Sequence, residues 1–152
     1  MKAVAARVER AAVTLRDGPR SGERRETGRG LLILLGVGPA DDQGTARKLA
    51  DKILALRVFS NAEGKFDRSV VDERGEILLV PQFTLYASLK GGRRPDFTGA
   101  ARPETARPIY ERVAALLAAS GLTVKTGEFG ASMAVESVND GPVTVLVDTD
   151  RF

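Results

Sequence analysis

Apolar and polar residues alternate from the start of the chain. The alternation runs through residues 2–15, first at Val4, Ala6 and Val8 and then, on the opposite parity, at Ala11, Val13 and Leu15. A period of two is typical of a β-strand, and the change of parity near Arg10 predicts a bulge or bend within one long strand. Residues 17–30 are rich in Gly, Arg and Glu, which predicts a loop or a polar hairpin.

The next apolar segments predict a buried strand and then a helix. Residues 31–37 form a continuous apolar run that is short enough for a central strand. Asp41 or Asp42 can cap a helix that runs to about Arg57. Apolar residues recur in this segment at helical spacing, at Ala46, Leu49, Ala50, Ile53 and Leu54. Residues 61–64 (Asn-Ala-Glu-Gly) then predict a turn.

The second half of the chain predicts a strand, a helix and further strands. Residues 76–86 have the pattern of one strand, and residues 103–120 that of a helix ended by Gly121. A proline inside a helix removes a hydrogen bond, so Pro108 predicts that the first turn of this helix is separate from the rest. The remaining residues supply one or two more strands.

An unusual Gly-Pro pair lies between two of these late strands. Residues 131–138 and 143–147 have strand patterns, and an Asn-Asp-Gly-Pro run joins them. These four residue types favour turns, so the local sequence predicts a hairpin turn. A cis bond before a proline occurs in only about 5–6% of cases in folded proteins, and these residues alone do not predict one.

No repeat, linker or change of composition divides the chain. We therefore predict a single α+β domain over residues 1–152, with strands in the majority and two main helices packed outside. Hydrophobic residues make up 43% and charged residues 28% of the sequence, as in soluble globular proteins. No apolar run approaches the roughly 20 residues of a membrane span, so we expect a cytoplasmic protein without a membrane partner.

The sequence contains no cysteine and no histidine. Disulfides, thiolate metal sites and every Ser-His-Asp or Cys-His arrangement are therefore excluded. We expect no metal site and no cofactor, and any catalysis must use other side chains, main-chain groups or the substrate itself.

The formal net charge of +3 permits a partner that carries phosphate but does not demand one. The loop Lys90-Gly91-Gly92-Arg93-Arg94 carries three of the basic residues. It is equally consistent with a flexible surface loop and with a contact to RNA backbone.

Two motifs, in this order, resemble those of the D-aminoacyl-tRNA deacylase family. The first is Gln-Phe-Thr-Leu at residues 82–85, and the second is Asn-Asp-Gly-Pro-Val-Thr at residues 139–144. The resemblance extends over nearly the whole chain, including Arg7-Val8, residues 57–65, Arg94-Pro95 with Phe97, and residues 126–133. It implies a compact β-barrel-like fold with the helices outside.

The resemblance also implies an activity. Members of the family are homodimeric hydrolases that cleave the ester joining a D-amino acid, or glycine, to the 3′ end of tRNA, which is a proofreading reaction. The active site is expected at the subunit interface, so the implied partners are aminoacyl-tRNA and a second copy of the chain.

Residue roles carry over from the matched motifs. By resemblance, Gly141 and Pro142 form a cis peptide whose carbonyl groups project into the partner's pocket, where they reject an L side chain. Arg7 is expected to fix the orientation of this motif, supported by Met133 and Asn139. Arg7 on its own would be read as a solvated residue on a strand.

The first motif is implied to carry the catalytic groups, Gln82, Phe83 and Thr84. Their main-chain N–H groups are the implied donors to the oxyanion, with the Thr84 hydroxyl near the ester. The 2′-hydroxyl of the tRNA is implied to replace a side-chain base. Without the resemblance, residue type and position would predict that Thr84 is an ordinary strand residue and that Phe83 lies in the core.

One departure from the family pattern bears on specificity. Pro81 stands where the family motif begins with serine, and it provides neither a hydroxyl nor an N–H group. A related deacylase that tolerates L-alanine also has proline there, but Phe83 and Arg7 favour the D-specific reading. The alternatives are a relaxed L-aminoacyl-tRNA proofreading enzyme and a non-catalytic tRNA-binding module.

Overall fold

The computed structural model of the protein describes residues 1–152 and contains eight strands, two α-helices and two short 3-10 helices. The strands are β1 (Lys2–Leu15), β2 (Arg24–Thr27), β3 (Gly30–Gly36), β4 (Phe59–Ser60), β5 (Phe66–Arg68), β6 (Glu76–Pro81), β7 (Val124–Thr126) and β8 (Met133–Asp148). The helices are α1 (Gln43–Ala55), η1 (Phe83–Tyr86), α2 (Pro103–Ala118) and η2 (Thr149–Arg151).

Strand β1 is the element on which the main sheet is built. Its first half pairs with β3, its second half with β2, and nearly its whole length with β8, all antiparallel. The pairing with β8 shifts register between Ala6 and Val8 and again between Val8 and Arg10. The predicted long strand and its irregularity near Arg10 are therefore confirmed.

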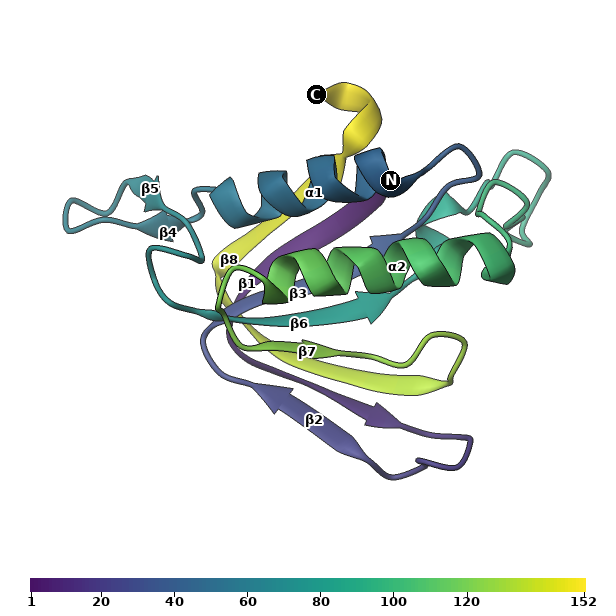
Figure 1. The fold of residues 1–152 in the computed structure, drawn as a ribbon, viewed down its shortest axis with the longest axis horizontal. Helices are drawn as coiled ribbons and strands as arrows, with labels where there is room; N and C mark the ends of the chain where they lie inside the picture. The colour runs from purple at the N-terminus through teal and green to yellow at the C-terminus, as the bar shows by residue number, and fades with distance from the viewer.

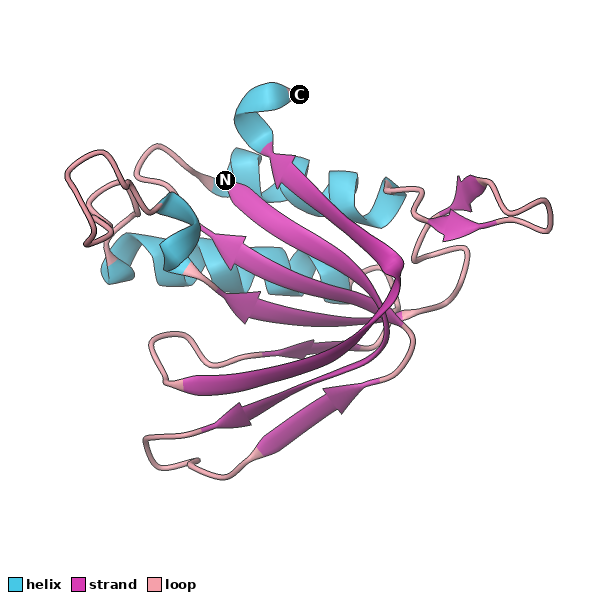
Figure 2. Cartoon of the chain, turned by 180° about the vertical axis from the view of Figure 1, so that it is seen from behind, coloured by secondary structure: helices cyan, strands magenta, loops and turns pink.

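The six strands of the main sheet curl into a nearly closed barrel. The order is β2-β1-β3-β6-β7, with β8 on the other side of β1, and β6 runs parallel to both β3 and β7. The strands converge at one end and spread apart at the other (Figures 1 and 2). Arg25 Nη1 donates to Thr126 O at 2.6 Å, which ties β2 to β7 across the open side.

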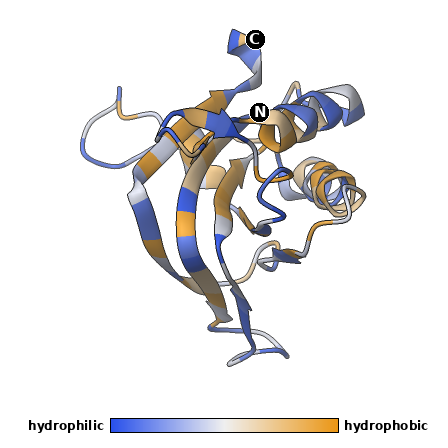
Figure 3. Cartoon of the chain, turned by 90° about the vertical axis from the view of Figure 1, so that its left-hand side faces the viewer, coloured by the Kyte–Doolittle hydropathy of each residue, from blue (hydrophilic) through white to orange (hydrophobic).

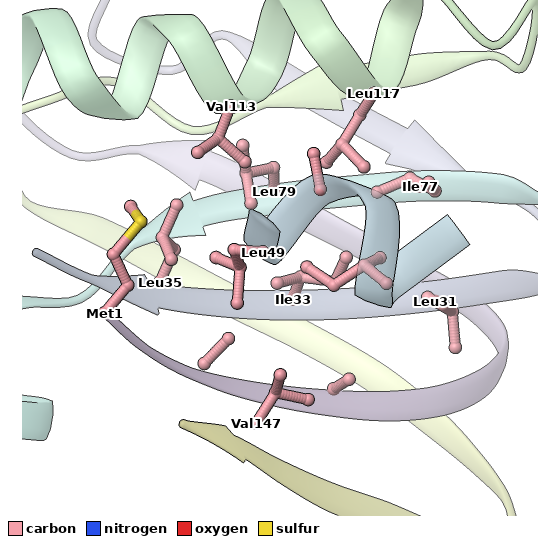
Figure 4. Packing of buried hydrophobic residues seen from close by; sticks show 14 of the residues in the cluster. Met1, Leu31, Ile33, Leu35, Leu49, Ile77, Leu79, Val113, Leu117 and Val147 are labelled. Carbon is pink, nitrogen blue, oxygen red and sulfur yellow. The ribbon is translucent and has the colours of Figure 1, made fainter. Parts of the chain in front are cut away.

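Helices α1 and α2 cover one face of this sheet (Figure 1). Buried apolar side chains of both helices pack there against β1, β3 and β6, as Figure 4 shows in close-up. The helical contributors are Ala46, Leu49, Ala50, Ile53, Ala106, Ile109, Tyr110, Val113 and Leu117. The expected α+β fold, barrel-like with two main helices outside, is confirmed.

A second, smaller core fills the inside of the curl. It consists of Ala6, Val8, Ala11, Val13, Leu32, Leu78 and Val80, with Leu34 and Met133 packed against them. Hydrophobic and hydrophilic bands alternate along the long strands (Figure 3), because successive side chains of a strand point to opposite faces. The change of parity in β1 lets the two halves of that strand serve different parts of the core.

Three sequence predictions need correction. The Asn-Asp-Gly-Pro run is not a hairpin turn, because β8 continues through it and both of its halves pair with β1. The strand that begins at Glu76 ends at Pro81 and does not reach Tyr86. Helix α2 is continuous through Pro108. Pro108 removes one hydrogen bond from the helix. The free energy gained by burying the apolar residues that follow it offsets this loss of stability.

The other element predictions are confirmed. Helix α1 begins after Asp42, whose side chain accepts a hydrogen bond from the Thr45 N–H. The polar segment before Gly30 is a hairpin between β1 and β2, and the run at residues 61–64 is the turn between β4 and β5. No helix is long and apolar enough to cross a membrane.

Gly30 lies where β3 approaches β6 most closely, and this contact predicts a large effect on stability. A Cβ atom at Gly30 would lie 1.9 Å from Glu76 O and 2.6 Å from Glu76 N, both main-chain atoms. We expect Gly30→Ala to lower the free energy of unfolding by about 3 kcal/mol, and Tm by about 10 °C. The matched control is Gly91→Ala, because Gly91 has no atom within 4 Å of an added Cβ. Equal unfolding midpoints in urea for the two variants would contradict the assignment.

Candidate functional site

The chain leaves the sheet directly after Pro81. Gln82 N–H donates to Leu35 O at 2.7 Å, which is the last hydrogen bond toward β3. The N–H groups of Leu85 and Ala87 then donate back to Gln82 O and Thr84 O, so the segment turns instead of extending. This turn, and not a strand, presents the predicted catalytic residues.

Two main-chain N–H groups of this turn are free to bind a ligand. The first donors of a helical turn have no partner within it, and the N–H groups of Phe83 and Thr84 donate to no acceptor in the protein. The N–H group of Gln82 is already used by Leu35 O. Of the three predicted oxyanion donors, the geometry therefore leaves Phe83 and Thr84.

The side chains of the same turn constrain one another. Gln82 Nε2 donates to Thr84 Oγ1, which holds the hydroxyl in place but cannot remove its proton, because an amide is not a base. Phe83 is 58% exposed, and its ring meets that of Phe97 edge to face, with 5.2 Å between centroids. Phe83 is thus not the core residue that its type alone would predict.

A cavity of about 740 Å³ opens beside this turn. Most of its lining is apolar and comes from the end of β6, the loop before α2, α2 itself and the start of β8. The residues include Pro81, Gln82, Phe83, Phe97, Ala100, Ala101, Arg102, Tyr110, Phe129, Ala131 and Met133. The predicted site residues Gln82, Phe83 and Met133 therefore share one pocket, with Thr84 next to it in the turn.

One tyrosine lines this pocket and another ends the turn beside it. Tyr110 donates its hydroxyl to Leu79 O at 2.8 Å, and burial raises its pKa well above the ordinary value. Burial, and then the charge of Asp41, likewise raise the pKa of Tyr86 at the end of η1. Both phenols therefore stay protonated and neutral, as structural groups and not as bases.

The second motif forms a wide bulge in β8. Asn139 is paired with Val8 and Thr144 with Ala6, so four residues of β8 face Arg7 alone. The side chain of Asn139 closes the bulge by accepting from Val143 N–H at 3.0 Å and donating to Thr144 Oγ1 at 2.9 Å. Within the bulge the Gly141-Pro142 peptide is cis, and Gly141 has a φ of +131°. This left-handed backbone favours glycine.

Arg7 holds the bulge from the opposite strand. Its side chain is buried, with only 8% of the residue exposed. Nη1 donates to Val58 O at 2.6 Å, and Nε lies 3.2 Å from Asp140 O and 3.1 Å from Asp140 Oδ2. A buried guanidinium needs such partners, because an unpaired buried charge is costly. The interpretation from residue type alone, that Arg7 is a solvated residue on a strand, is therefore wrong.

The two motifs do not meet within one chain. Arg7 lies opposite Leu31 in β3, whereas Gln82 binds Leu35, and four residues of a strand span about 13 Å. No residue of the bulge lines the cavity. In Figure 1, β8 bends at the left end of the sheet, and the turn and loop that follow β6 lie at the right end.

The arrangement has no conventional acid–base or metal group. No three Asp or Glu side chains come close enough together to hold a metal ion. The chemistry that the site offers is hydrogen bonding from main-chain N–H groups, a positioned hydroxyl and an apolar pocket with aromatic walls.

The sequence did not single out several residues that shape the site. Phe129 and Phe97 lie in loops, where no periodic pattern marks a residue as facing a pocket, and the family resemblance includes Phe97 without giving it a role. Asp140 pairs with Arg7, and only its place within the second motif could have suggested a role.

Comparison with known proteins gives one consistent result. Residues 4–148 match the family model described as D-Tyr-tRNA(Tyr) deacylase. A relative from Deinococcus radiodurans, named D-aminoacyl-tRNA deacylase, is 52% identical over 97% of this chain and 99% of its own length. One of the same name from Herpetosiphon aurantiacus is 48% identical over 100% of this chain and 97% of its own.

Solved structures share the fold. A structure named "c-Myc DNA Unwinding Element Binding Protein" superimposes with a TM-score of 0.87 at 41% identity, covering 97% of this chain and 98% of its own. A structure of "a probable eukaryotic D-amino acid tRNA deacylase" has a TM-score of 0.84, with 96% of this chain and 97% of its own covered. At 15% identity, the latter likeness concerns the fold alone.

Proposed function

Because the chain belongs to the D-Tyr-tRNA(Tyr) deacylase family, we propose that it hydrolyses the ester that joins a D-amino acid, or glycine, to the 3′ end of tRNA. The observation that carries this proposal is the likeness, at about half identity and over the whole chain, to proteins named D-aminoacyl-tRNA deacylase. The geometry supports it, because the site suits a reaction that needs no side-chain base.

The cavity receives the aminoacylated end of the tRNA. Its aromatic side chains, Phe83, Phe97 and Phe129, offer the flat faces on which an unpaired nucleobase stacks. A base held there places the ester beside the turn at residues 82–84. The apolar lining also excludes water other than the one that reacts, which strengthens polar interactions inside the pocket.

The free N–H groups of Phe83 and Thr84 stabilise the reaction's developing charge. Water adds to the ester carbonyl, and the carbonyl oxygen becomes negative before the 3′ oxygen of the tRNA leaves. Removal of one donor aimed at such an oxygen costs about 3–4 kcal/mol in another hydrolase. The adjacent 2′-hydroxyl of the tRNA relays the proton that the attacking water loses to the leaving 3′ oxygen, so no protein base is needed.

Thr84 acts as a positioning group and not as a nucleophile. An alcohol needs a base to become an effective nucleophile, and its hydroxyl accepts a hydrogen bond from the Gln82 amide. Its place next to the free N–H groups suits contact with the ester or with the reacting water.

Gly141 and Pro142 form the chiral screen, and they act on the pocket of a second subunit. The bulge carries their carbonyl groups outward, fixed by Arg7 and Asn139, and it does not reach the cavity of its own chain. A homodimer that brings the bulge of one subunit to the cavity of the other completes the site. Rigid carbonyl groups there reject an L side chain by collision, whereas a D side chain or glycine fits.

The central prediction concerns substrates. We expect the purified protein, with a chelator present, to hydrolyse D-Tyr-tRNA and Gly-tRNA rapidly and to spare L-Tyr-tRNA. Release of the labelled amino acid measures each rate. Hydrolysis of the L ester as well would indicate that Pro81 relaxes the site. Binding of all three substrates without hydrolysis would instead leave a tRNA-binding module.

Substitution of Arg7 should lower the selectivity for D-Tyr-tRNA over L-Tyr-tRNA. Both Arg7→Ala and Arg7→Lys remove donors that fix the bulge, so we expect the ratio of D-Tyr-tRNA to L-Tyr-tRNA hydrolysis to fall by about tenfold or more. Arg7→Lys keeps the charge and serves as the variant that retains more of the fold, which circular dichroism checks. An unchanged ratio in both variants would show that Arg7 does not orient the screen.

The shared site predicts complementation between two defective subunits. A Cβ at Gly141 would lie 2.7 Å from Val143 Cγ2 and 3.2 Å from Arg7 Nη2, so Gly141→Val distorts the bulge that completes the site of the other subunit, whereas Ala100→Trp fills the cavity. Each variant alone should be nearly inactive. In a random mixture, half of the dimers combine the two, and each of these holds one intact site.

Co-expression should therefore restore about a quarter of the wild-type activity per subunit. Size-exclusion chromatography with light scattering checks that the dimers form. A mixture as inactive as its components, with mixed dimers present, would rule out a site shared between subunits.

A further inference from the structure

The net charge of the chain is concentrated in one short segment. Residues 90–107 contain five basic side chains, Lys90, Arg93, Arg94, Arg102 and Arg107, and two acidic ones, Asp96 and Glu104. The segment therefore carries the whole formal charge of +3, and the rest of the chain holds 18 basic and 18 acidic residues. The five cations are called the basic rim below.

The basic rim is free of the ion pairs that occupy many cations elsewhere. Arginines in β2 and in the loop before it, for example, pair with Glu23, Glu26, Glu128 and Glu136. No member of the rim lies within 4 Å of a carboxylate oxygen, and all five are exposed. Asp96 is held by Thr98, accepting from its N–H at 3.0 Å and its hydroxyl at 2.7 Å. Five positive charges therefore lie at the surface without an acidic partner.

The rim lies beside the cavity. Arg102 lines the cavity, and Arg107 Nη2 donates to the carbonyl oxygen of Phe129, another lining residue, at 3.3 Å. The other three cations lie in the loop that follows η1. This loop is closed by paired hydrogen bonds between Ser88 and Asp96, and packing of Phe97 against Phe83 anchors it beside the catalytic turn. Figures 1 and 2 show the loop projecting beside the first turn of α2.

We infer that the basic rim binds the phosphate backbone of the tRNA acceptor end, just outside the nucleotide that enters the cavity. This inference rests on the proposed function, which places the 3′ end of a tRNA in that cavity. The phosphates on the 5′ side of that terminal nucleotide then lie at the mouth, where the five cations without an acidic partner are. Exposed Lys and Arg side chains that contact phosphates supply affinity without reading the base sequence.

The backbone of the loop suits this role. Gly91 and Gly92 separate Lys90 from the arginines, and an added Cβ at either glycine would meet no atom within 4 Å. The cations therefore extend from a segment that is anchored at both ends but unobstructed at its tip. Such a loop can adjust to a backbone whose bases differ from one tRNA to the next.

The test compares two variants of equal net charge. The rim triple is Lys90→Gln/Arg93→Gln/Arg94→Gln, and none of these residues lines the cavity. The control triple is Arg47→Gln/Lys52→Gln/Arg74→Gln. Its residues are also exposed and form no ion pair, but they lie in α1 and in the turn before β6.

Binding of unacylated tRNA, followed by fluorescence anisotropy over a series of salt concentrations, is the direct readout. We expect the rim triple to bind about tenfold or more weakly near 0.1 M salt, and the slope of log affinity against log salt to fall by about 3. The control triple should bind as the wild type does. Equal loss in both triples, or an unchanged slope in the rim triple, would overturn the inference.

A second readout separates this inference from the proposed function. We expect the rim triple to raise KM for D-Tyr-tRNA by about tenfold while its rate on the minimal ester D-Tyr-adenosine stays close to that of the wild type. Loss of both activities in the rim triple alone would show a structural effect and contradict the phosphate role. If wild-type protein hydrolyses neither substrate, the proposed function fails, whereas the anisotropy measurement still decides whether the rim binds RNA.

Discussion

The pairing of one buried guanidinium holds together the parts of this fold that would otherwise be independent. Arg7 lies in the central strand, and its side chain binds the carbonyl of Val58, before β4, and residue Asp140 of the bulge in β8. A buried charge must keep its partners, so the three segments are fixed relative to one another. The bulge is consequently a rigid projection at the end of the sheet, although a proline and a glycine form its tip.

The candidate site at the other end of the molecule is built from main-chain groups. A chain without histidine or cysteine lacks the usual nucleophiles and bases, yet the turn after Pro81 exposes two main-chain N–H groups next to an apolar cavity. These donors are set by backbone geometry and not by side-chain ionisation. Pro81 is the last residue of β6, and it contributes no N–H group to the ladder.

Much of the fold follows from local patterns, whereas the site does not. The alternation in residues 2–15 and the cap at Asp42 were sufficient to predict β1 and α1. The Asn-Asp-Gly-Pro run and the segment after Pro81 were mispredicted from local propensities, because pairing with β1 and bonding to Leu35 override them. The site residues Gln82, Phe83, Thr84 and Arg7 came from a family resemblance. Phe97 was noted only as part of that resemblance, and neither Phe97 nor Phe129 was predicted to line the pocket, since loop residues show no periodicity.

The bulge in β8 also bears on how the molecule behaves in a crowded solution. β8 pairs with β1 on one side only, so its 16 residues form a long outer edge of the sheet. Long, regular edges invite strands of other molecules to add on and start aggregation. Here the edge is broken near its middle, where the backbone bends away and Pro142 offers no donor. The two halves therefore do not form one continuous edge, so the bulge that we propose as the chiral screen also limits strand addition by other molecules.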